Sequence, residues 1–278
     1  MYDCETTEMG EAKKKQQRHR RVMQAANGCI YCAGRRRAEQ VDHMPPRMMF
    51  RLGQRPKGLE FPSCGPCNQG TSRLDVAASF MARTFPGIAT SADSAEWDKV
   101  MSEVHRVAPD LLREMWIPPH EMRQAMWSEG IFDRNFAAFR ADGPIMGAYM
   151  QAFAAKIGFA LHYEATGNFV PRRAECRCDG SQARRCMAVV CPQPIRQYWD
   201  ARIMQQGKIT SQGNFEYGWG TYLESPDVPL YYARVREAFA AAAFVVLDEG
   251  SLPFPEGELA TFAPGDLVMP LSDRITAG

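Results

Sequence analysis

Two pairs of closely spaced cysteines are the residues of this chain best suited to hold a metal ion. Cys29 and Cys32 form one CxxC pair, and Cys64 and Cys67 form a second. Each CxxC turn lets two thiolates reach one tetrahedral ion, so two turns complete a closed Zn²⁺ site without an open position. The alternative is four unconnected buried thiols. Because a closed site performs no reaction itself, we expect its zinc to be structural and any catalysis to come from neighbouring residues.

Residues that could hydrolyse a phosphodiester lie between and beside the two cysteine pairs. Asp42 and His43 are adjacent between the pairs, and Asn68 directly follows the fourth cysteine. Such a hydrolysis needs a base that activates water and a cation that takes up charge on the phosphate. The Asp42 carboxylate is a hard ligand suited to Mg²⁺ or Mn²⁺. The His43 imidazole, with a reference pKa of about 6.5, can accept a proton from water at neutral pH. The alternative is a structural histidine and an asparagine that merely begins a helix.

The order of these motifs resembles that of the zinc-stapled HNH endonuclease family, which has a ββα-metal fold. The matching segments are CIYC, VDHMPP and CGPCN, and the resemblance covers roughly residues 28–80. It implies that His43 is the general base and that Asp42 and Asn68 bind one catalytic Mg²⁺ or Mn²⁺ ion. It also implies a structural zinc ion and a DNA substrate, with RNA as the alternative. Arg73, a little further along, is a candidate clamp for the scissile phosphate.

Two positions depart from the family pattern. Many members have an asparagine shortly before the position of Asn68, where this chain has Gly58, Leu59 and Glu60. Ser72 stands where many members have a further histidine or asparagine ligand. These departures leave open a second function, that of a non-catalytic zinc-ribbon module that binds nucleic acid as a regulator or scaffold.

Positive charge is concentrated in the first part of the chain. The net charge of the chain is +1, but residues 1–80 hold 14 Lys and Arg against 8 Asp and Glu. The remainder is acidic, with 19 against 24. This asymmetry favours a polyanionic partner for the first part, with solvated helix faces as the alternative. The cations before and within the motif region are Lys13, Lys14, Lys15, Arg18, Arg20, Arg21, Arg35, Arg36, Arg37, Arg47, Arg51, Arg55 and Lys57.

The composition excludes several other classes of protein. Apolar residues make up 45% and charged residues 23% of the 278 residues, which is the balance of a globular protein. The longest apolar run extends over ten residues, from Ala238 to Leu247, whereas a membrane helix needs about 20. The N-terminus has no apolar signal segment. We therefore expect a cytoplasmic protein without a membrane partner, and the sequence leaves its oligomeric state open.

Apolar periodicity and turn residues predict an α+β protein in four segments. A basic helix is expected within 1–27, an HNH nuclease module within 28–86, a helical segment within 87–140, and an α+β domain of open role within 141–278. Inside the module we expect strands near 39–42 and 59–62 and a helix over about 67–84. Long helices are expected over 93–107 and about 144–167. Residues 215–223 alternate as a strand does, and 231–247 fit either a strand or a helix. One further alternative makes the C-terminal domain the main functional unit and the module its effector.

A second group of cysteines lies in an arginine-rich segment further along the chain. Cys176, Cys178, Cys186 and Cys191 could form another zinc loop that grips nucleic acid. A CxC step is less typical of zinc sites than CxxC. We therefore interpret these residues as reduced thiols, with metal binding as the alternative. Single helical histidines such as His162 are interpreted as packing residues.

Overall fold

The computed structural model of the chain describes residues 16–17, 19–24, 27–52, 54–84, 91–130, 139–171, 185–191, 201–222, 225–246 and 259–268. Residues 19–24 are helical, within the basic helix expected over 1–27, while residues 1–15 lie outside the described part. Helices and antiparallel strands occur together, which agrees with the expected α+β class.

A short antiparallel hairpin lies near the start of the described fold. Both expected strands are present, and each begins one residue later than the pattern indicated. Regular pairing sets Asp42 opposite Phe61 and His43 opposite Glu60. The elements of this part are η1 (Ile30–Cys32), β1 (Gln40–His43), η2 (Arg47–Met49) and β2 (Glu60–Ser63).

The helix expected over about 67–84 is present but divided. α2 (Gly65–Gly70) begins early, with Pro66 in its first turn, and α3 (Ser72–Thr84) follows after Thr71. The Thr71 hydroxyl donates a hydrogen bond of 2.9 Å to the Cys67 carbonyl oxygen. Side-chain hydrogen bonds of this type compete with the helical backbone pattern, which accounts for the break.

Prolines begin three helices of the next segment. Pro109, Pro119 and Pro144 each stand in a first turn, where the missing amide hydrogen has no helical partner to lose. The longest helix ends at Gly167, as expected from the sequence, and the φ of 70° at this glycine is a left-handed cap. The helices are α4 (Ser91–Val107), α5 (Pro109–Met115), α6 (Pro119–Ser128) and α7 (Pro144–Thr166), so the helices expected over 93–107 and 144–167 are confirmed.

An antiparallel sheet of six strands, in the order β10-β3-β9-β8-β7-β4, forms the second half of the fold. The alanine-rich segment left open by the sequence is strand. All residues of β9 are buried, and burial on both faces explains why the segment shows no clear period. The strands are β3 (Arg185–Cys191), β4 (Arg202–Ile203), β7 (Phe215–Tyr222), β8 (Ser225–Val235), β9 (Phe239–Val246) and β10 (Ala260–Phe262), with a separate hairpin of β5 (Gln205–Gln206) and β6 (Ile209–Thr210) and a last turn η4 (Asp266–Val268).

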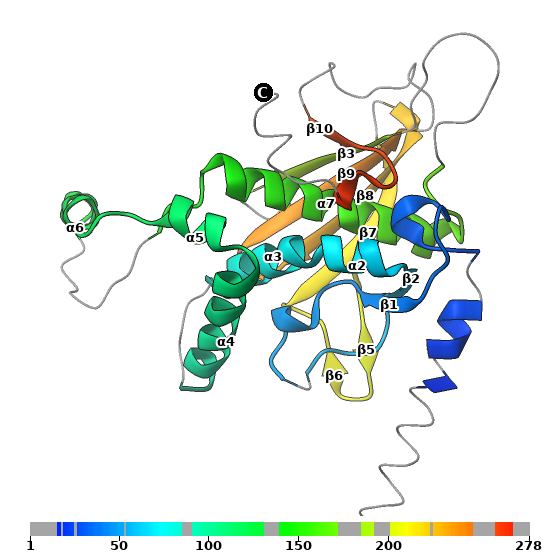
Figure 1. Cartoon of the computed structure of the whole chain (residues 1–278), viewed down its shortest axis with the longest axis horizontal. Helices are drawn as coiled ribbons and strands as arrows, with labels where there is room; N and C mark the ends of the chain where they lie inside the picture. The colour runs from blue at the N-terminus through cyan, green and yellow to red at the C-terminus, as the bar shows by residue number, and fades with distance from the viewer. Residues whose placement is uncertain are drawn as a thin grey trace, which may run out of the picture.

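The helix α7 lies between the sheet and the N-terminal elements (Figure 1). It packs against η1 and α3 on one side and against β3, β8 and β9 on the other. One continuous cluster of buried apolar side chains extends from Cys29 to Leu267 and crosses the boundaries expected near residues 86 and 140. The N-terminal hairpin and the C-terminal sheet therefore share one core, to which α7 contributes from both sides.

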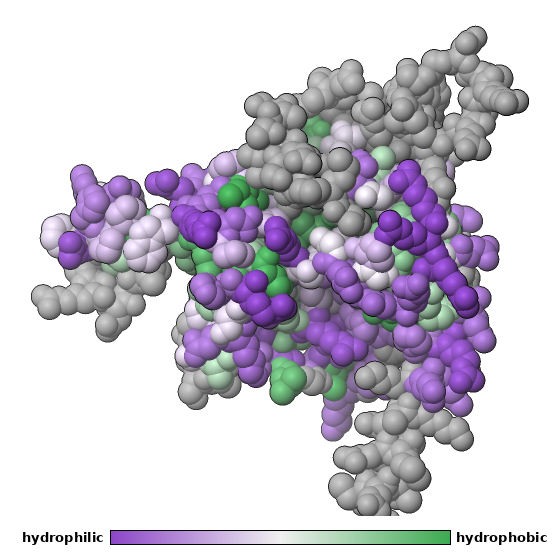
Figure 2. All heavy atoms as spheres, in the orientation of Figure 1, coloured by the Kyte–Doolittle hydropathy of each residue, from purple (hydrophilic) through white to green (hydrophobic). Residues whose placement is uncertain are grey.

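The surface of the face seen in Figure 1 is largely hydrophilic where it is described (Figure 2). Among the helices that the structure describes, none combines the length and the apolar character that crossing a bilayer requires.

Candidate metal centre and active site

Four cysteine thiols meet beside the hairpin. The ligand atoms of Cys29, Cys32, Cys64 and Cys67 lie within 4.8 Å of one another, and all four residues are buried. The first pair brackets η1, and the second pair lies at the start of α2. This separation suits a tetrahedral ion with metal–sulfur bonds of about 2.3 Å. The cluster can therefore hold a structural metal such as zinc, as the spacing of the cysteines predicts.

Hydrogen bonds between the thiols and their burial shift the pKa values of this cluster. A hydrogen bond from the Cys67 thiol lowers the pKa of Cys29 to about 5. Donating that hydrogen bond, together with burial, raises the pKa of Cys67. Burial raises the pKa of Cys32 as well. Metal ligation requires thiolates, so an ion that binds here replaces the thiol protons.

The turn that carries the first cysteine pair depends on a glycine. Gly28 has a φ of 134°, a conformation that residues with side chains rarely adopt. A Cβ atom at this position would lie 2.7 Å from the Cα atom of Gly34. The turn is closed by the Cys29 amide, which donates to the Arg36 carbonyl oxygen at 3.0 Å. Close backbone approach at Gly28 thus fixes the direction in which the first pair enters the cluster.

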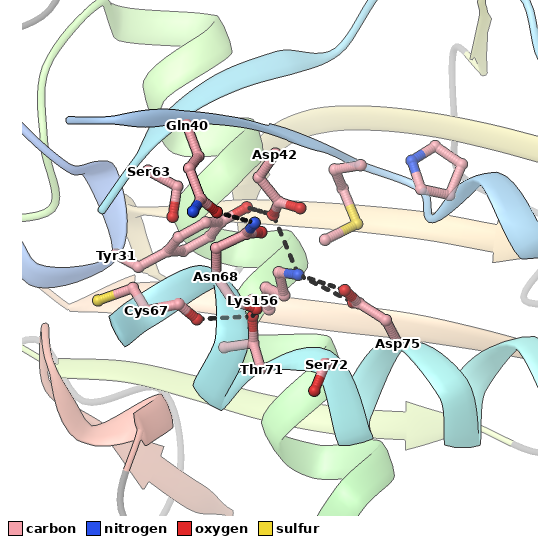
Figure 3. A network of polar contacts seen from close by, with 12 residues as sticks. Tyr31, Gln40, Asp42, Ser63, Cys67, Asn68, Thr71, Ser72, Asp75 and Lys156 are labelled. Carbon is pink, nitrogen blue, oxygen red and sulfur yellow. Dashed lines mark hydrogen bonds and ion pairs between the residues drawn. The ribbon is translucent and has the colours of Figure 1, made fainter. Parts of the chain in front are cut away.

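The Asp42 carboxylate lies in the interior of the protein, where two donors hold it (Figure 3). The Tyr31 hydroxyl donates to its Oδ2 atom at 2.5 Å. The Nζ atom of Lys156 lies 3.0 Å from the same oxygen, and the lysine side chain is 0% exposed. Lys156 stands in the middle of α7, so this contact crosses from the central helix to the motif-bearing strand.

Lys156 also holds a second carboxylate. Its Nζ atom donates to Oδ1 and Oδ2 of Asp75 on α3 at 2.9 and 2.8 Å. The same atom lies 5.4 Å from the centre of the Tyr31 ring, within the range of a cation–π contact. One buried ammonium group therefore joins β1, α3 and α7.

Charge in this cluster is divided unevenly between the two carboxylates. Burial raises the pKa of Asp42, but the Lys156 ammonium and the Tyr31 hydroxyl outweigh burial and hold that pKa below its ordinary value. Burial lowers the pKa of Lys156, but the two carboxylates outweigh it and raise that pKa. Burial, with a contribution from the Asp42 charge, raises the pKa of Asp75 to about 7. Asp42 and Lys156 therefore form the charged pair, and Asp75 is the carboxylate whose protonation the surroundings favour.

Asn68 and Arg73, two other residues expected in the site, have separate surroundings. The Asn68 side-chain amide donates to the Oε1 atom of Gln40 on β1 at 2.5 Å, and Figure 3 shows it in the polar cluster with Asp42. Arg73 is exposed on α3. Burial raises the pKa of Tyr149 to about 12, and the nearby Arg73 charge opposes this rise. The structure therefore places Asn68 against Gln40 on β1, the strand that carries Asp42, while the contact described for Arg73 is with α7.

His43 lies on the face of β1 opposite to Asp42, because successive side chains of a regular strand point in opposite directions. Its Nε2 atom is 2.7 Å from Nη2 of Arg47 and 3.5 Å from Oε1 of Glu60. A guanidinium only donates, so Nε2 accepts in this contact and a neutral imidazole carries its proton on Nδ1. The side chain is 20% exposed, so water can reach it. His43 is thus a proton acceptor beside a cation and a carboxylate, and it is not brought to Asp42.

The surroundings of Asp42 do not fit a Mg²⁺ or Mn²⁺ ion held by Asp42 and Asn68. An ion such as Mg²⁺ takes about six oxygen ligands at ~2.0–2.1 Å, several of them water. Asp42 is only 6% exposed, and its Oδ2 atom already has two donors. The Lys156 ammonium supplies the positive charge that the carboxylate needs, and it would repel a second cation at the same oxygen.

Reasoning from the sequence did not connect Lys156, Tyr31 and Asp75 with the motif. The one signal that the sequence offered was the position of Lys156 within an apolar helix. In the structure, all residues of this helix from 152 to 162 are buried. A lysine is almost never buried without a partner, so this position predicts an internal carboxylate. The sequence offers no way to tell which carboxylate, because the partners are 81 residues and more away along the chain.

The second cysteine group falls largely beyond the described residues. Cys176 and Cys178 lie outside them, and for Cys186 and Cys191 only the backbone in β3 is described. The interpretation of this group as reduced thiols stays a prediction, with metal binding as its alternative. His162, expected to be a packing residue, is buried, and its Nδ1 atom lies 3.0 Å from the Tyr231 hydroxyl.

Comparisons with known proteins give no relative from which a function could be transferred. No family model, no curated protein and no solved structure matches the chain.

Proposed function

We propose that the chain is an HNH-type endonuclease that hydrolyses phosphodiester bonds in DNA, or alternatively in RNA, with His43 as the general base. The observation that carries the proposal is the surroundings of the His43 imidazole. Its Nε2 atom accepts a hydrogen bond from Arg47 at 2.7 Å and lies 3.5 Å from the Glu60 carboxylate. A proton acceptor, a cation and a carboxylate thus meet on the face of β1 opposite to the buried cluster.

Each of these three groups has a role in the proposed reaction. The lone pair on Nε2 takes a proton from the attacking water while the water oxygen bonds to phosphorus. The bond from phosphorus to one ester oxygen breaks, and this leaving oxygen takes a proton from solvent water. Arg47, displaced from Nε2, turns its forked guanidinium to the phosphate oxygens, where it neutralises developing charge. The imidazolium that forms finds the Glu60 carboxylate within 3.5 Å, which stabilises its charge. The structural metal in the four cysteines holds the hairpin that presents these groups.

The proposed mechanism does not include the Mg²⁺ or Mn²⁺ ion that the family resemblance implies. The test nevertheless varies the divalent cation. Asp42 is paired with Lys156, so no step is assigned to a cation bound by Asp42 and Asn68. Arg47, and Arg73 if a bound strand reaches it, supply the positive charge on the phosphate. Activity is therefore measured with Mg²⁺, with Mn²⁺ and with a chelator, and zinc content is determined in each preparation.

A plasmid-nicking assay with matched histidine variants tests the proposal. His43→Ala should reduce the rate by about 10²–10⁴-fold, the usual loss when a general base is removed. His120→Ala is the control, because that histidine is 74% exposed on α6. Zinc content and DNA affinity should be equal in all three proteins. Equal nicking by wild type and His43→Ala, or no cleavage of DNA or RNA under any metal condition, would refute the proposal.

One observation favours a second function, that of a non-catalytic module that binds nucleic acid. The buried ammonium of Lys156 takes the place of a catalytic cation at Asp42. A binding module needs the metal-stabilised hairpin and the surrounding arginines, but not a cation at that carboxylate. Salt-dependent DNA binding without cleavage under any condition would support this function over the first.

A further inference from the structure

A groove lies where the connection between β1 and β2 meets the β5–β6 hairpin. Figure 1 shows this hairpin projecting beside the chain that joins the two N-terminal strands. The groove has a volume of about 480 Å³ and is lined by residues from both halves of the chain. Phe50, Arg51 and Gln54 line one side, and Lys208, Asn214 and Arg236 belong to the other.

The lining of the groove is strongly positive. Arg51, Lys208 and Arg236 contribute cations, and no carboxylate is among the lining residues described. Arg51 pairs with Asp93 at 2.7 Å. Within the described ranges, neither Lys208 nor Arg236 forms an ion pair with a carboxylate. The groove therefore holds more positive charge than its own neighbours neutralise.

Arg236 is held in a position that charge alone would disfavour. Its Nε atom donates to Oδ1 of Asn214 at 3.3 Å, and its Nη1 atom donates to the Ala82 carbonyl oxygen at 3.4 Å. Burial, and after it the charges of Arg83 and Arg51, lower the pKa of Arg236, and the weaker effect of the Asp93 charge opposes them. Neutral acceptors thus keep a half-buried guanidinium near two others, an arrangement that a bound anion would stabilise.

Both walls of the groove are fixed in place. Arg83 is buried and donates to the carbonyl oxygens of Met48 and Phe50, the second at 2.6 Å, which holds the wall that contains Arg51. The Lys57 amide donates to Oε1 of Gln206 at 3.0 Å, which joins this wall to the β5–β6 hairpin. A site fixed in this way needs little ordering when a ligand binds, so more of the interaction energy appears as affinity.

We propose that this groove binds phosphate groups of the nucleic-acid backbone, with Lys208 and Arg236 as contacts supplied by the C-terminal part of the chain. The inference deepens the proposed function and rests on nucleic acid being the ligand of the N-terminal module. It assigns part of the phosphate binding to the C-terminal part, whose sequence is acidic overall. A phosphate ester could also come from a free nucleotide, and the test separates the two sources.

The test measures binding of a fluorescent DNA duplex by anisotropy at several salt concentrations. All proteins carry His43→Ala, so that cleavage does not interfere. Lys208→Gln is the first variant, because the side chain is exposed at a hairpin turn and its loss should leave the fold intact. Arg236→Gln is the second. Arg123→Gln on α6, also exposed, is the control that removes one positive charge elsewhere.

Each phosphate contact contributes about 0.9 to the magnitude of the slope of log K against log salt concentration. At 0.1 M salt, this corresponds to an affinity about eightfold higher than the contact would give at about 1 M salt. Lys208→Gln and Arg236→Gln should each lose about that much affinity and slope, whereas Arg123→Gln should lose neither. Equal affinity and slope for Lys208→Gln and Arg123→Gln would overturn the proposal. A second arm measures binding of a free deoxynucleoside monophosphate. If the groove variants lost nucleotide binding but kept duplex binding, the assignment to the nucleic-acid backbone would be wrong.

The two proposals fail independently. If the groove variants weaken duplex binding but the protein never nicks DNA, the proposal of phosphate binding by the groove is supported and the proposed nuclease activity is refuted. Nicking that depends on His43, with groove variants that bind as well as the control, would do the reverse.

Discussion

Replacing Lys156 by methionine tests whether its ammonium is the internal counter-charge of the motif. Methionine has nearly the same length and no charge, so Lys156→Met removes the cation with little change in packing volume. The variant loses the contact of 3.0 Å with Asp42 and the contacts of 2.9 and 2.8 Å with Asp75. Asp42 then remains in the interior, and Asp75 remains half-buried beside it, without a cation.

The expected loss of stability follows from the charge left behind. Burial already raises the pKa of Asp75 to about 7 in the wild type, so the main change in protonation is expected at Asp42. Asp42 is ionised in the wild type and must take up a proton in the folded variant. Protonating a carboxyl group with an unfolded-state pKa of about 3.9 at pH 7 costs about 4 kcal/mol, because each unit is worth about 1.36 kcal/mol. Breaking buried ion pairs from one side typically costs about 3–5 kcal/mol, so the two values agree.

The pH dependence of this loss has a definite sign. Without Lys156, the folded-state pKa of Asp42 is raised above its unfolded value, so the folded variant binds more protons than the unfolded chain. Stability of the variant relative to wild type should therefore rise as the pH falls towards about 4. At pH 5 the same arithmetic leaves a loss of about 1.5 kcal/mol.

Urea unfolding of zinc-loaded protein at pH 7 and pH 5 measures both values. Lys99→Met is the matched control, since that side chain is 63% exposed on α4 and its loss should stay within about 0.5 kcal/mol. A loss below about 1 kcal/mol at pH 7, or an equal loss at the two pH values, would refute the reasoning. If Lys156→Met does not fold, the double variant Asp42→Asn with Lys156→Met should be the more stable of the two, because it leaves one fewer charge unpaired.

Two further predictions concern the residues around the hairpin. Cys64→Ser should lose the bound zinc in elemental analysis and destabilise the hairpin, because metal binding contributes folding free energy. The control Cys4→Ser, which changes a cysteine outside both pairs, should keep its zinc. A Cys64→Ser protein with full zinc content would contradict the proposed zinc site. Tyr31→Phe should cost about 1–3 kcal/mol and raise the pKa of Asp42, because the hydroxyl at 2.5 Å stabilises the ionised carboxylate; an unchanged Asp42 titration by NMR would contradict that role.

Features that depend on residues close together in the sequence could be predicted from the sequence. The paired strands around Asp42 and Glu60, the proline at the start of α7 and the glycine after its end depend on residues a few positions apart. The cysteine cluster was readable because CxxC spacing is itself the geometry of a metal turn. The alanine-rich strand β9 was ambiguous, because a segment buried on every side shows no polar period.

The local sequence pattern does not show whether the Asp42 and His43 side chains point to the same face of β1 or to opposite faces. A bend in β1 could aim both side chains at one phosphate, and a regular strand sends them to opposite faces. The regular register with β2 decides between these outcomes. The partner of Asp42 is equally non-local, since Lys156 reaches it only because α7 packs against both η1 and α3.

The buried lysine also sets the order in which the chain can mature during synthesis. Asp75 precedes Lys156 by 81 residues, and Asp42 is earlier still. At about 5–20 residues per second, the ribosome needs about 4–16 s to make the intervening chain. During that interval the nascent hairpin has its thiols but neither its counter-ion nor the apolar face of α7. We therefore expect the N-terminal segment to remain incompletely folded until the central helix α7 has left the ribosomal exit tunnel. For the same reason, residues 28–86 are a poor choice for expression as an independent fragment.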